Sequence, residues 1–425
     1  KRGRAALTVC STPFTVLGRT QAVALGHPDL PIAVIPHPFG LRSRDEVRSI
    51  AEQCVADIAR LVCEPAADGD ANAAKPTSAQ PGFVEAPVDP DEFNRFCRAC
   101  GWSDGLPLVP PTVERVEAML RQTRRARDDV IAAVAPGFGA ATIAHLAANA
   151  VMAGCEAEYL PVLIAAVDGL ADPAFNLQGI QATTNPAAPW LIVNGPIARD
   201  LGINGALNCL GQGAWANATL GRAVRLILQN VGGARPGEMD RATHGQPGKY
   251  TFCCAENEAE NPWEALHVER GFARDCSTVT VVGASGTLNM NSHAKEADDL
   301  LRAIADTMAY PLSNDYYFGG EPWVILSPEH AEILKRDGLG KADVKRRLWE
   351  QSRFAAGRFA VKDRARVQHI RRAELGTIDV NTLMPAAPGP DGIGIIVAGG
   401  PGTHSVYVPT FGVTRAITRA VTVES

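Results

Sequence analysis

The first 64 residues alternate between short apolar runs and segments with helical spacing. Residues 5–10 (AALTVC) and 31–36 (PIAVIP) have the pattern of short buried strands. After each strand, at residues 14–25 and 43–61, apolar side chains recur on one helical face. A strand–helix–strand–helix order predicts parallel pairing, because the helix returns the chain to the same end of the sheet. The pattern therefore predicts the C-terminal part of a small α/β domain over residues 1–64.

The apolar pattern stops after this unit. Residues 65–90 are rich in Pro, Ala, Gly and Asp and have no periodicity, which is typical of a linker. Periodic segments resume afterwards, so we expect a second, larger α/β domain over residues 91–425.

The larger region contains two segments of similar sequence pattern, which we call the first echo. PWLIVNGP (189–196) and PWVILSP (322–328) each read as an apolar strand that ends in a polar-Pro turn and is followed by a short helix. Each is also followed by a long amphipathic helix, expected at 216–230 and at 341–354. The echo predicts an internal duplication within the larger domain.

A second echo pairs residues 279–293 with 393–405, since both run from an apolar strand through a glycine turn to a His-bearing segment. The glycine loops GASG (283–286) and AGGPG (398–402) could offer backbone N–H groups to a substrate. Neither has the G-x-G-x-x-G or Walker pattern, so no nucleotide cofactor is predicted. The candidate substrate ligands from this part of the chain are Gly286, Gly400 and Ser405, with Asn194 from the first echo.

Composition narrows the class of function. The net charge of −5 and the pI of about 6.0 show no basic excess, which argues against a nucleic-acid surface. No apolar run approaches the roughly 18–20 residues that span a membrane. The ten cysteines have irregular spacing and form no disulfide framework, so we expect a reducing cytoplasm. The long amphipathic helices could also form a subunit interface, so a homo-oligomer is an open alternative.

The densest group of reactive side chains is TFCCAENEAENPWEALHVERGF (251–272). Alternation over residues 250–255 predicts a strand that places Cys253 and Cys254 on opposite faces. A returning strand over residues 266–270 would place His267 and Glu269 on one face, across a turn rich in carboxylates.

Two chemistries fit this arrangement. In the first, Cys253 is a nucleophilic or redox thiol and His267 is its base. Further proton carriers would be Glu256, Glu258 and Glu269, and the substrate would be held by Lys249, Arg270 and Asn257. In the second, a metal-dependent lyase or hydrolase uses a divalent metal on His267, Glu269, His293 and His404. A non-catalytic small-ligand-binding or assembly protein with a solvated acidic loop is the third alternative.

Residues 26–40 (GHPDLPIAVIPHPFG) resemble the second half of the UGSC family of (seleno)proteins, which are small α/β domains named for a selenocysteine- or cysteine-Gly-Ser-Cys motif. The rest of the chain is similar to the domain that is often fused to that module. The matching stretches are WSDGLPLVPPT (102–112), NAVMAGCEAEYLPV (149–162), GIQATTNPAAPWLIVNGP (179–196), NATLGRAVRLILQNVGGARPGEMD (217–240) and HGQPGKYTFCCAENEAENPWEALHVERGF (244–272).

The resemblance implies where the site lies. Its motif includes Cys253, Glu256, Asn257, Glu258, Trp263, His267, Glu269 and Arg270, whereas Cys254 stands where the family tends to be apolar. The naming tetrapeptide is expected before Lys1 and does not occur in the sequence. The family is also distantly similar to the selenocysteine-bearing subunits of glycine and proline reductases. The leading prediction is thus a cytoplasmic enzyme whose cysteine thiolate attacks a small anionic or carbonyl- or heteroatom-containing molecule.

Overall fold

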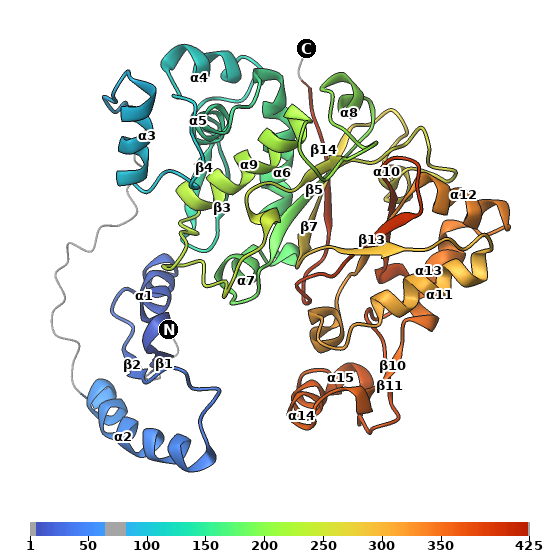
Figure 1. Ribbon diagram of the computed structural model, residues 1–425. Helices are drawn as coiled ribbons and strands as arrows, with labels where there is room; N and C mark the ends of the chain where they lie inside the picture. The colour runs from blue at the N-terminus through green and yellow to red at the C-terminus, as the bar shows by residue number, and fades with distance from the viewer. Residues whose placement is uncertain (1–5, 64–81, 424–425) are drawn as a thin grey trace.

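The computed structural model describes residues 6–63 and 82–423, and the first of these ranges forms the predicted parallel unit (Figure 1). β1 (Thr8–Ser11) pairs in parallel with β2 (Ile32–Ile35). A 3₁₀ turn, η1 (Thr12–Phe14), and α1 (Thr15–Ala24) follow β1, and α2 (Arg44–Cys63) follows β2. A side chain at Gly18 would lie 2.9 Å from Cys10 Sγ, so glycine there lets α1 approach the sheet. The predicted linker lies partly outside the described residues, and its residues 82–89 form no helix or strand.

Two four-stranded sheets form the centre of the larger region. The first has the order β14 (Ile417–Ala420), β7 (Thr278–Ala284), β5 (Ala188–Asn194) and β6 (Cys253–Ala255). The second has the order β8 (Leu288–Asn291), β13 (His404–Val408), β9 (Trp323–Leu326) and β12 (Gly394–Val397). In both sheets one pair is parallel, β5 with β6 and β9 with β12, and the other two pairs are antiparallel. The predicted α/β class is confirmed.

The two sheets have equivalent strand orders and are joined by a reciprocal crossing. Ala284, at the end of β7, forms an isolated antiparallel bridge with Thr410, just after β13. The Ser285 N–H donates to the Pro409 oxygen at 2.7 Å, and the Phe411 N–H donates reciprocally to the Gly283 oxygen at 2.9 Å. Beyond this crossing β8 joins the second sheet and β14 joins the first, so the halves exchange their edge strands. The internal duplication itself stays a prediction.

The strand order corrects the second echo. Parallel partners occupy equivalent places, so β12 is the counterpart of β6, and β13 is the counterpart of β7. The pairing of residues 279–293 with 393–405 was therefore wrong, because it aligned β7 with β12. The first echo aligns β5 with β9, which do hold equivalent places.

The sheets pack face to face between two helical layers (Figure 1). Trp190 and Ile192 of β5 point to the other sheet, where Trp323 and Ile325 meet them. The rings of Trp190 and Trp323 lie edge to face, with centroids 5.9 Å apart. The alternate residues of β5 pack under α5 (Ile143–Ala153), α6 (Leu160–Leu170) and α9 (Trp215–Asn230). The second sheet is covered by α11 (Ala297–Met308), α12 (Pro328–Arg336) and α13 (Lys341–Gln351).

Shorter elements surround these layers. Before β5 lie α3 (Pro90–Ala99), α4 (Val113–Leu120), the hairpin β3 (Val130–Val134) and β4 (Gly139–Thr142), η2 (Ala157–Tyr159), η3 (Pro173–Phe175) and α7 (Leu177–Ala182). Between the strands of the first sheet lie α8 (Pro196–Asp200), η4 (Pro247–Lys249) and α10 (Leu266–Glu269). The second half adds a π-helical turn, η5 (Asp315–Gly319), β10 (Phe354–Ala355), η6 (Ala356–Arg358), α14 (Val361–Ile370), α15 (Arg372–Leu375), β11 (Leu383–Met384) and η7 (Pro390–Gly392).

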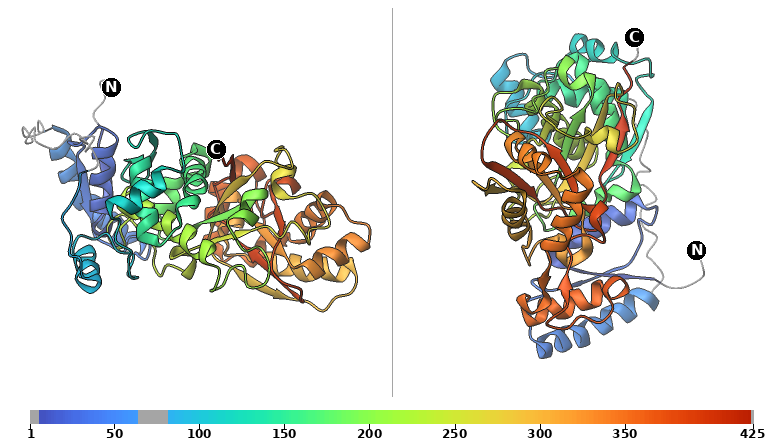
Figure 2. Two further views of the ribbon diagram at one scale, coloured as in Figure 1. Left: turned by 90° about the horizontal axis from the view of Figure 1, so that it is seen from above. Right: turned by 90° about the vertical axis from the view of Figure 1, so that its right-hand side faces the viewer.

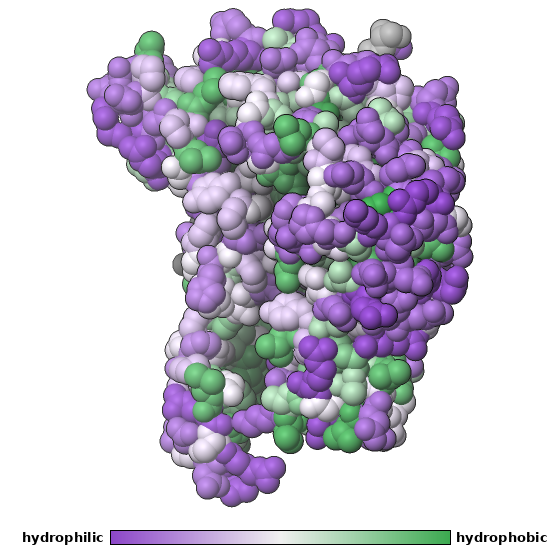
Figure 3. All heavy atoms as spheres, turned by 45° about the vertical axis from the view of Figure 1, so that its right-hand side comes forward, coloured by the Kyte–Doolittle hydropathy of each residue, from purple (hydrophilic) through white to green (hydrophobic). Residues whose placement is uncertain are grey.

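The N-terminal unit lies at one end of the molecule (Figure 2). The Gln21 side chain bonds to the Pro136 carbonyl and to Gln178, and the Arg241 guanidinium lies 5.4 Å from the centre of the Phe14 ring. No single helix in the described ranges is long and apolar enough to cross a membrane, although one bent pair, Ala157–Leu170 with Pro173–Ala182, passes on length and composition. The face in Figure 3 is mostly hydrophilic, with smaller apolar groups between.

Candidate functional site

Polar side chains gather where the parallel strands β5 and β6 end side by side. Asn194 is the last residue of β5, and Glu256 and Glu258 follow β6. The Asn194 amide donates to Glu256 Oε2 at 2.6 Å and to Glu258 Oε1 at 2.9 Å. Because parallel strands end at the same edge, residues 62 and 64 positions apart in sequence meet there. One amide thus holds two carboxyl groups together.

Gly195 completes the binding of Glu258. Its backbone N–H donates to Glu258 Oε1 at 2.7 Å. Gly195 has φ of 83°, and a Cβ there would lie 2.4 Å from the Cys276 carbonyl oxygen. Glycine is therefore required for the backbone to present this donor.

Glu256 is the buried carboxyl of the cluster. Besides Asn194, it accepts hydrogen bonds from the Asn261 amide at 2.8 Å and from the Leu266 N–H at 2.7 Å. Burial raises the pKa of Glu256, against the opposing effects of the Lys341 charge and these donors. Glu256 can therefore hold a proton more readily than an exposed glutamate.

His267 lies behind Glu258. Its ring is buried, with Nδ1 3.7 Å from Glu258 Oε1 and Nε2 3.3 Å from the Arg274 carbonyl oxygen. Within the described part of the chain, neither His267 Nδ1 nor Asn194 Oδ1 has a hydrogen-bond partner. The Glu258 side chain keeps 34% of its surface exposed, so this cluster reaches solvent through Glu258.

The segment that carries His267 differs from its prediction. Leu266–Glu269 is the short helix α10, and the expected returning strand is wrong. The Glu256 carboxylate accepts the N–H of Leu266, the first residue of this helix, where an anion is favourable. His267 thus reaches the cluster from a helix, and Glu269 lies apart from it, paired with Lys341 at 2.9 Å and with Lys345.

The two cysteines of β6 face opposite sides, as predicted. Cys253 packs in the core beneath the helices of the first half, and Cys254 packs between the sheets. Burial raises the pKa of the Cys253 thiol far above its ordinary value, so the thiolate is disfavoured there. Its position argues against the predicted role as a nucleophile.

The predicted cations are already paired with carboxylates. Lys249 Nζ lies 2.5 Å from Asp240 Oδ2, and Arg270 lies 3.0 Å from Glu321 Oε1 and bonds to the Ala416 carbonyl. Asn257 joins the two halves, because its N–H donates to the Val397 oxygen at 2.8 Å and its amide lies 3.4 Å from the Gly399 oxygen. The structure brings Asn257 next to the cluster but leaves Lys249 and Arg270 in ion pairs of their own.

The remaining predicted residues lie on the second sheet and its loops. Gly286 is in the crossing segment, and a side chain at Gly400 would lie 2.6 Å from Leu207. Ser405 is buried and bonded to His330 Nδ1 at 2.7 Å, while His293 and His404 are exposed. Across residues 6–63 and 82–423 no three His, Cys, Asp or Glu side chains are grouped to hold a metal, so the alternative metal set is not brought together.

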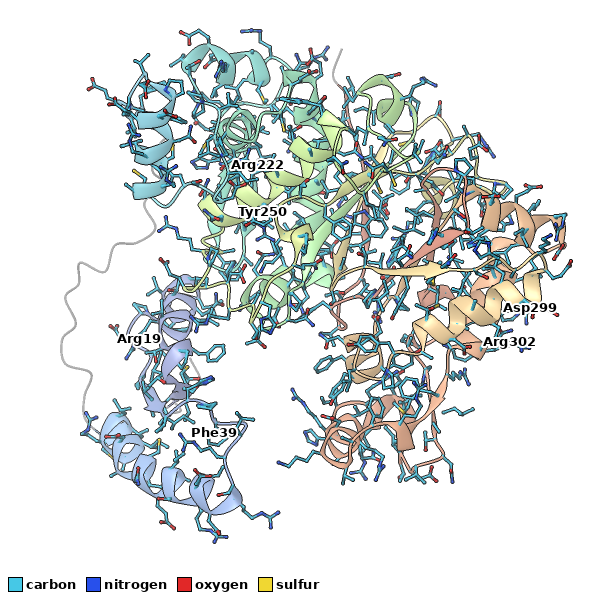
Figure 4. The ribbon with its side chains drawn as sticks, in the orientation of Figure 1. Arg19, Phe39, Arg222, Tyr250, Asp299 and Arg302 are labelled. Atoms are coloured by element: carbon cyan, nitrogen blue, oxygen red, sulfur yellow. The ribbon has the colours of Figure 1, made fainter. Side chains whose placement is uncertain are left out.

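Sequence reasoning missed two contributors. Asn261 lies inside the quoted motif, but its role depends on a turn that spacing alone does not define. Lys341 comes from α13 in the second half and bonds to the Glu264 carbonyl, a contact without any local sequence signal. Two surface depressions, of about 340 and 140 Å³, lie elsewhere; Asp298 and Arg302, the latter labelled in Figure 4, line the larger and Arg419 the smaller.

The fold and the cluster define an α/β protein with a carboxylate–imidazole site at a sheet edge. Residues 1–64 match the model of the UGSC family, so this N-terminal part is similar to that family. No curated protein and no solved structure matches the chain. The kinship of the larger region with the partner domain of that family stays a prediction.

Proposed function

We propose that the protein is an enzyme that transfers protons on a small molecule, with Glu258 as the acid–base group that meets the substrate. Glu258 accepts a proton from the substrate and delivers that proton, or one from solvent, to a second position. Such a cycle belongs to isomerases and lyases, and it needs no thiolate from Cys253.

The observation that carries the proposal is the shared set of contacts around Glu258. Its Oε1 accepts from Asn194 and Gly195 and faces the unpartnered His267 Nδ1 at 3.7 Å, while the rest of its side chain reaches solvent. A carboxylate held in place by fixed donors keeps its orientation during proton transfer. Glu256, Asn194 and His267 are positioning residues, because burial keeps them from a substrate.

The cluster also indicates a substrate class. The group of the cluster that reaches solvent is the Glu258 carboxylate, which is an acceptor. Among the described residues, Lys249, Arg270 and Lys341 pair with Asp240, Glu321 and Glu269, so these three charges are already neutralised. Of the anionic or carbonyl- or heteroatom-containing molecules expected from the sequence, the cluster therefore favours a neutral or cationic one that carries O–H or N–H donors.

The test is solvent-deuterium incorporation from a mixture of small metabolites incubated with the protein in D₂O and followed by mass spectrometry. We expect at least one compound to gain deuterium or to change in abundance with the native protein. Glu258→Gln preserves the acceptor oxygen but cannot take up a proton, so the rate should fall by about 100-fold.

Glu260→Gln is the matched control, because Glu260 is an exposed glutamate two residues away. This variant should retain the native rate. Turnover that survives Glu258→Gln would contradict the assignment, and a mixture left unchanged by the native protein would contradict the proposed activity.

A further inference from the structure

A buried group of cations lies before the start of β6, whereas Glu258 follows the end of that strand. Its central residue is Arg225 of α9, which is only 8% exposed. Arg225 Nε donates to the carbonyl of Lys249, the last residue of η4, at 2.9 Å. Arg225 Nη1 donates to Oε1 of Gln181 on α7 at 3.0 Å. Three elements of the first half therefore meet at this guanidinium.

The carboxylates near Arg225 already bind other cations. Burial lowers the pKa of Arg225, and the nearby charges of Asp240 and Asp104 oppose this effect. However, Asp240 Oδ2 lies 2.5 Å from Lys249 Nζ, and Asp104 accepts two bonds from the Arg222 guanidinium, at 2.8 and 2.9 Å. Among residues 6–63 and 82–423, no carboxylate lies within ion-pair distance of Arg225 itself. Three cations thus share two carboxylates, and one positive charge has no counter-ion.

The second half contains a buried guanidinium whose charge is balanced. Arg371 is also buried and donates to two backbone carbonyls, those of Tyr316 and Pro385. In addition it binds both oxygens of Glu374, at 3.0 and 2.6 Å. A buried charge is costly unless an opposite charge balances it. Arg225 has only neutral acceptors, so it lacks the counter-ion that Arg371 has.

Gln181 gives an independent indication of a ligand at the same place. Its side chain is 2% exposed, and its buried Nε2 has no hydrogen-bond partner among the described residues. A buried N–H donor without an acceptor is costly, as is a buried charge without a counter-ion. Because Gln181 Oε1 is bonded to Arg225, the amide lies beside the guanidinium, and one acceptor can bind both groups.

The cations lie near the surface of the first half. The side chains of Arg222 and Lys249 are partly exposed, and Tyr250, the residue after Lys249, is exposed. Figure 4 labels Arg222 and Tyr250, which mark this part of the surface. A small ion can therefore approach Arg225 between α9 and the segment that leads into β6.

We propose that Arg225 and Gln181 bind a small oxyanion, either a phosphate or a carboxylate group. The anion accepts hydrogen bonds from the guanidinium and from Gln181 Nε2, and its charge balances the positive charge of Arg225. A guanidinium suits such ions, because its planar N–H groups match two oxygens at once. This inference does not depend on proton transfer at Glu258, which lies beyond the other end of β6.

The test is calorimetric titration of the full chain with inorganic phosphate and, separately, with formate, at about pH 7 and constant ionic strength. We expect at least one of these ions to bind at a single saturable site. Tighter binding of phosphate would assign the site to phosphate groups, and tighter binding of formate would assign it to carboxylates. In Gln181→Glu the new carboxylate takes the place of the anion, so binding should weaken by at least about tenfold.

Gln178→Glu is the matched control, because Gln178 is an exposed residue of the same helix and the change in charge is identical. This variant should keep the native affinity. In chloride buffer, Gln181→Glu should unfold at a higher urea concentration than the native protein, since it neutralises Arg225. The proposal is overturned if neither ion binds saturably, if Gln181→Glu binds as the native protein does, or if Gln181→Glu unfolds at a lower urea concentration.

Discussion

The two halves of the larger region have equivalent strand orders, but they differ in the side chains that follow their parallel strands. At the end of β6 the Glu256 N–H donates to the Val193 oxygen, and at the end of β12 the Ala398 N–H donates to the Leu326 oxygen. Glu256 therefore stands where the second half has Ala398. The carboxylates of the first half are replaced in the second by a glycine-rich loop.

The histidine in each half sharpens this contrast. His330 bonds to Ser405 through Nδ1 and to the Ser292 carbonyl through Nε2, and burial lowers its pKa, so it is a neutral and fully paired core residue. His267 is equally buried but has an open Nδ1 beside a carboxylate that reaches solvent. A site is thus marked by unused bonding capacity, and a histidine alone does not indicate one.

The largest expected effect is on the stability of the first half. Glu256→Ala removes the acceptor of three hydrogen bonds and leaves buried donors unpaired. We expect a loss of about 3 kcal/mol in the free energy of unfolding, measured with urea. Glu260→Ala, on the exposed side of the same turn, should change it by less than about 0.5 kcal/mol. Equal effects would mean that the cluster is not a bonded unit.

A buried carboxyl in the second half gives a pH test. Asp315 accepts bonds from Tyr407 and Thr410, yet burial raises its pKa from 3.8 to about 6. The folded state then binds the proton more tightly, so this contribution to stability is present below pH 3.8 and is lost as the pH rises to about 6.

Asp315→Asn should remove this pH dependence, which is on the order of 2–3 kcal/mol between the two limits. Urea unfolding at several pH values, compared with the native protein, measures the difference. If both proteins have the same pH dependence across this range, the assignment of the slope to Asp315 fails.

The contact between the halves can be measured through its tryptophans. Trp190 and Trp323 hold equivalent places on β5 and β9, and their rings meet edge to face. A double-mutant cycle of Trp190→Phe and Trp323→Phe should give a coupling energy of about 1 kcal/mol. Additive effects would indicate that the two rings do not interact between the sheets.

The smallest expected change in stability is at Glu258. Glutamine can still accept from Asn194 and Gly195, and the side chain is partly exposed. Glu258→Gln should therefore alter the free energy of unfolding by no more than about 0.5 kcal/mol, measured with urea. A large loss of stability would show that the charge of Glu258 is structural.

Local pattern predicted the elements whose partners are near in sequence. The local spacing of apolar residues was enough to predict the parallel pairing of β1 with β2. It also predicted that Cys253 and Cys254 lie on opposite faces of β6. The segment Leu266–Glu269 was too short to distinguish a strand from a helical turn.

Contacts between the halves could not be predicted in the same way. β8 and β14 pair with strands that are distant in sequence. The sequence comparison could not detect this exchange, and it therefore aligned the wrong strands in the second echo. Asn194 was expected to bind substrate and instead holds two carboxyl groups that are distant in sequence. The sequence shows which residue types are present, but only the folded structure shows which of them come into contact.

The most direct test of the account compares His267→Gln with His330→Gln in the pH dependence of kcat, using a compound found by deuterium incorporation. We expect His267→Gln to lower kcat by about tenfold and to change its pH dependence, because His267 faces the acid–base group. His330→Gln should reduce stability and leave the kcat profile unchanged. A native profile in His267→Gln, or an altered one in folded His330→Gln, would contradict the placement of the chemistry in the first half.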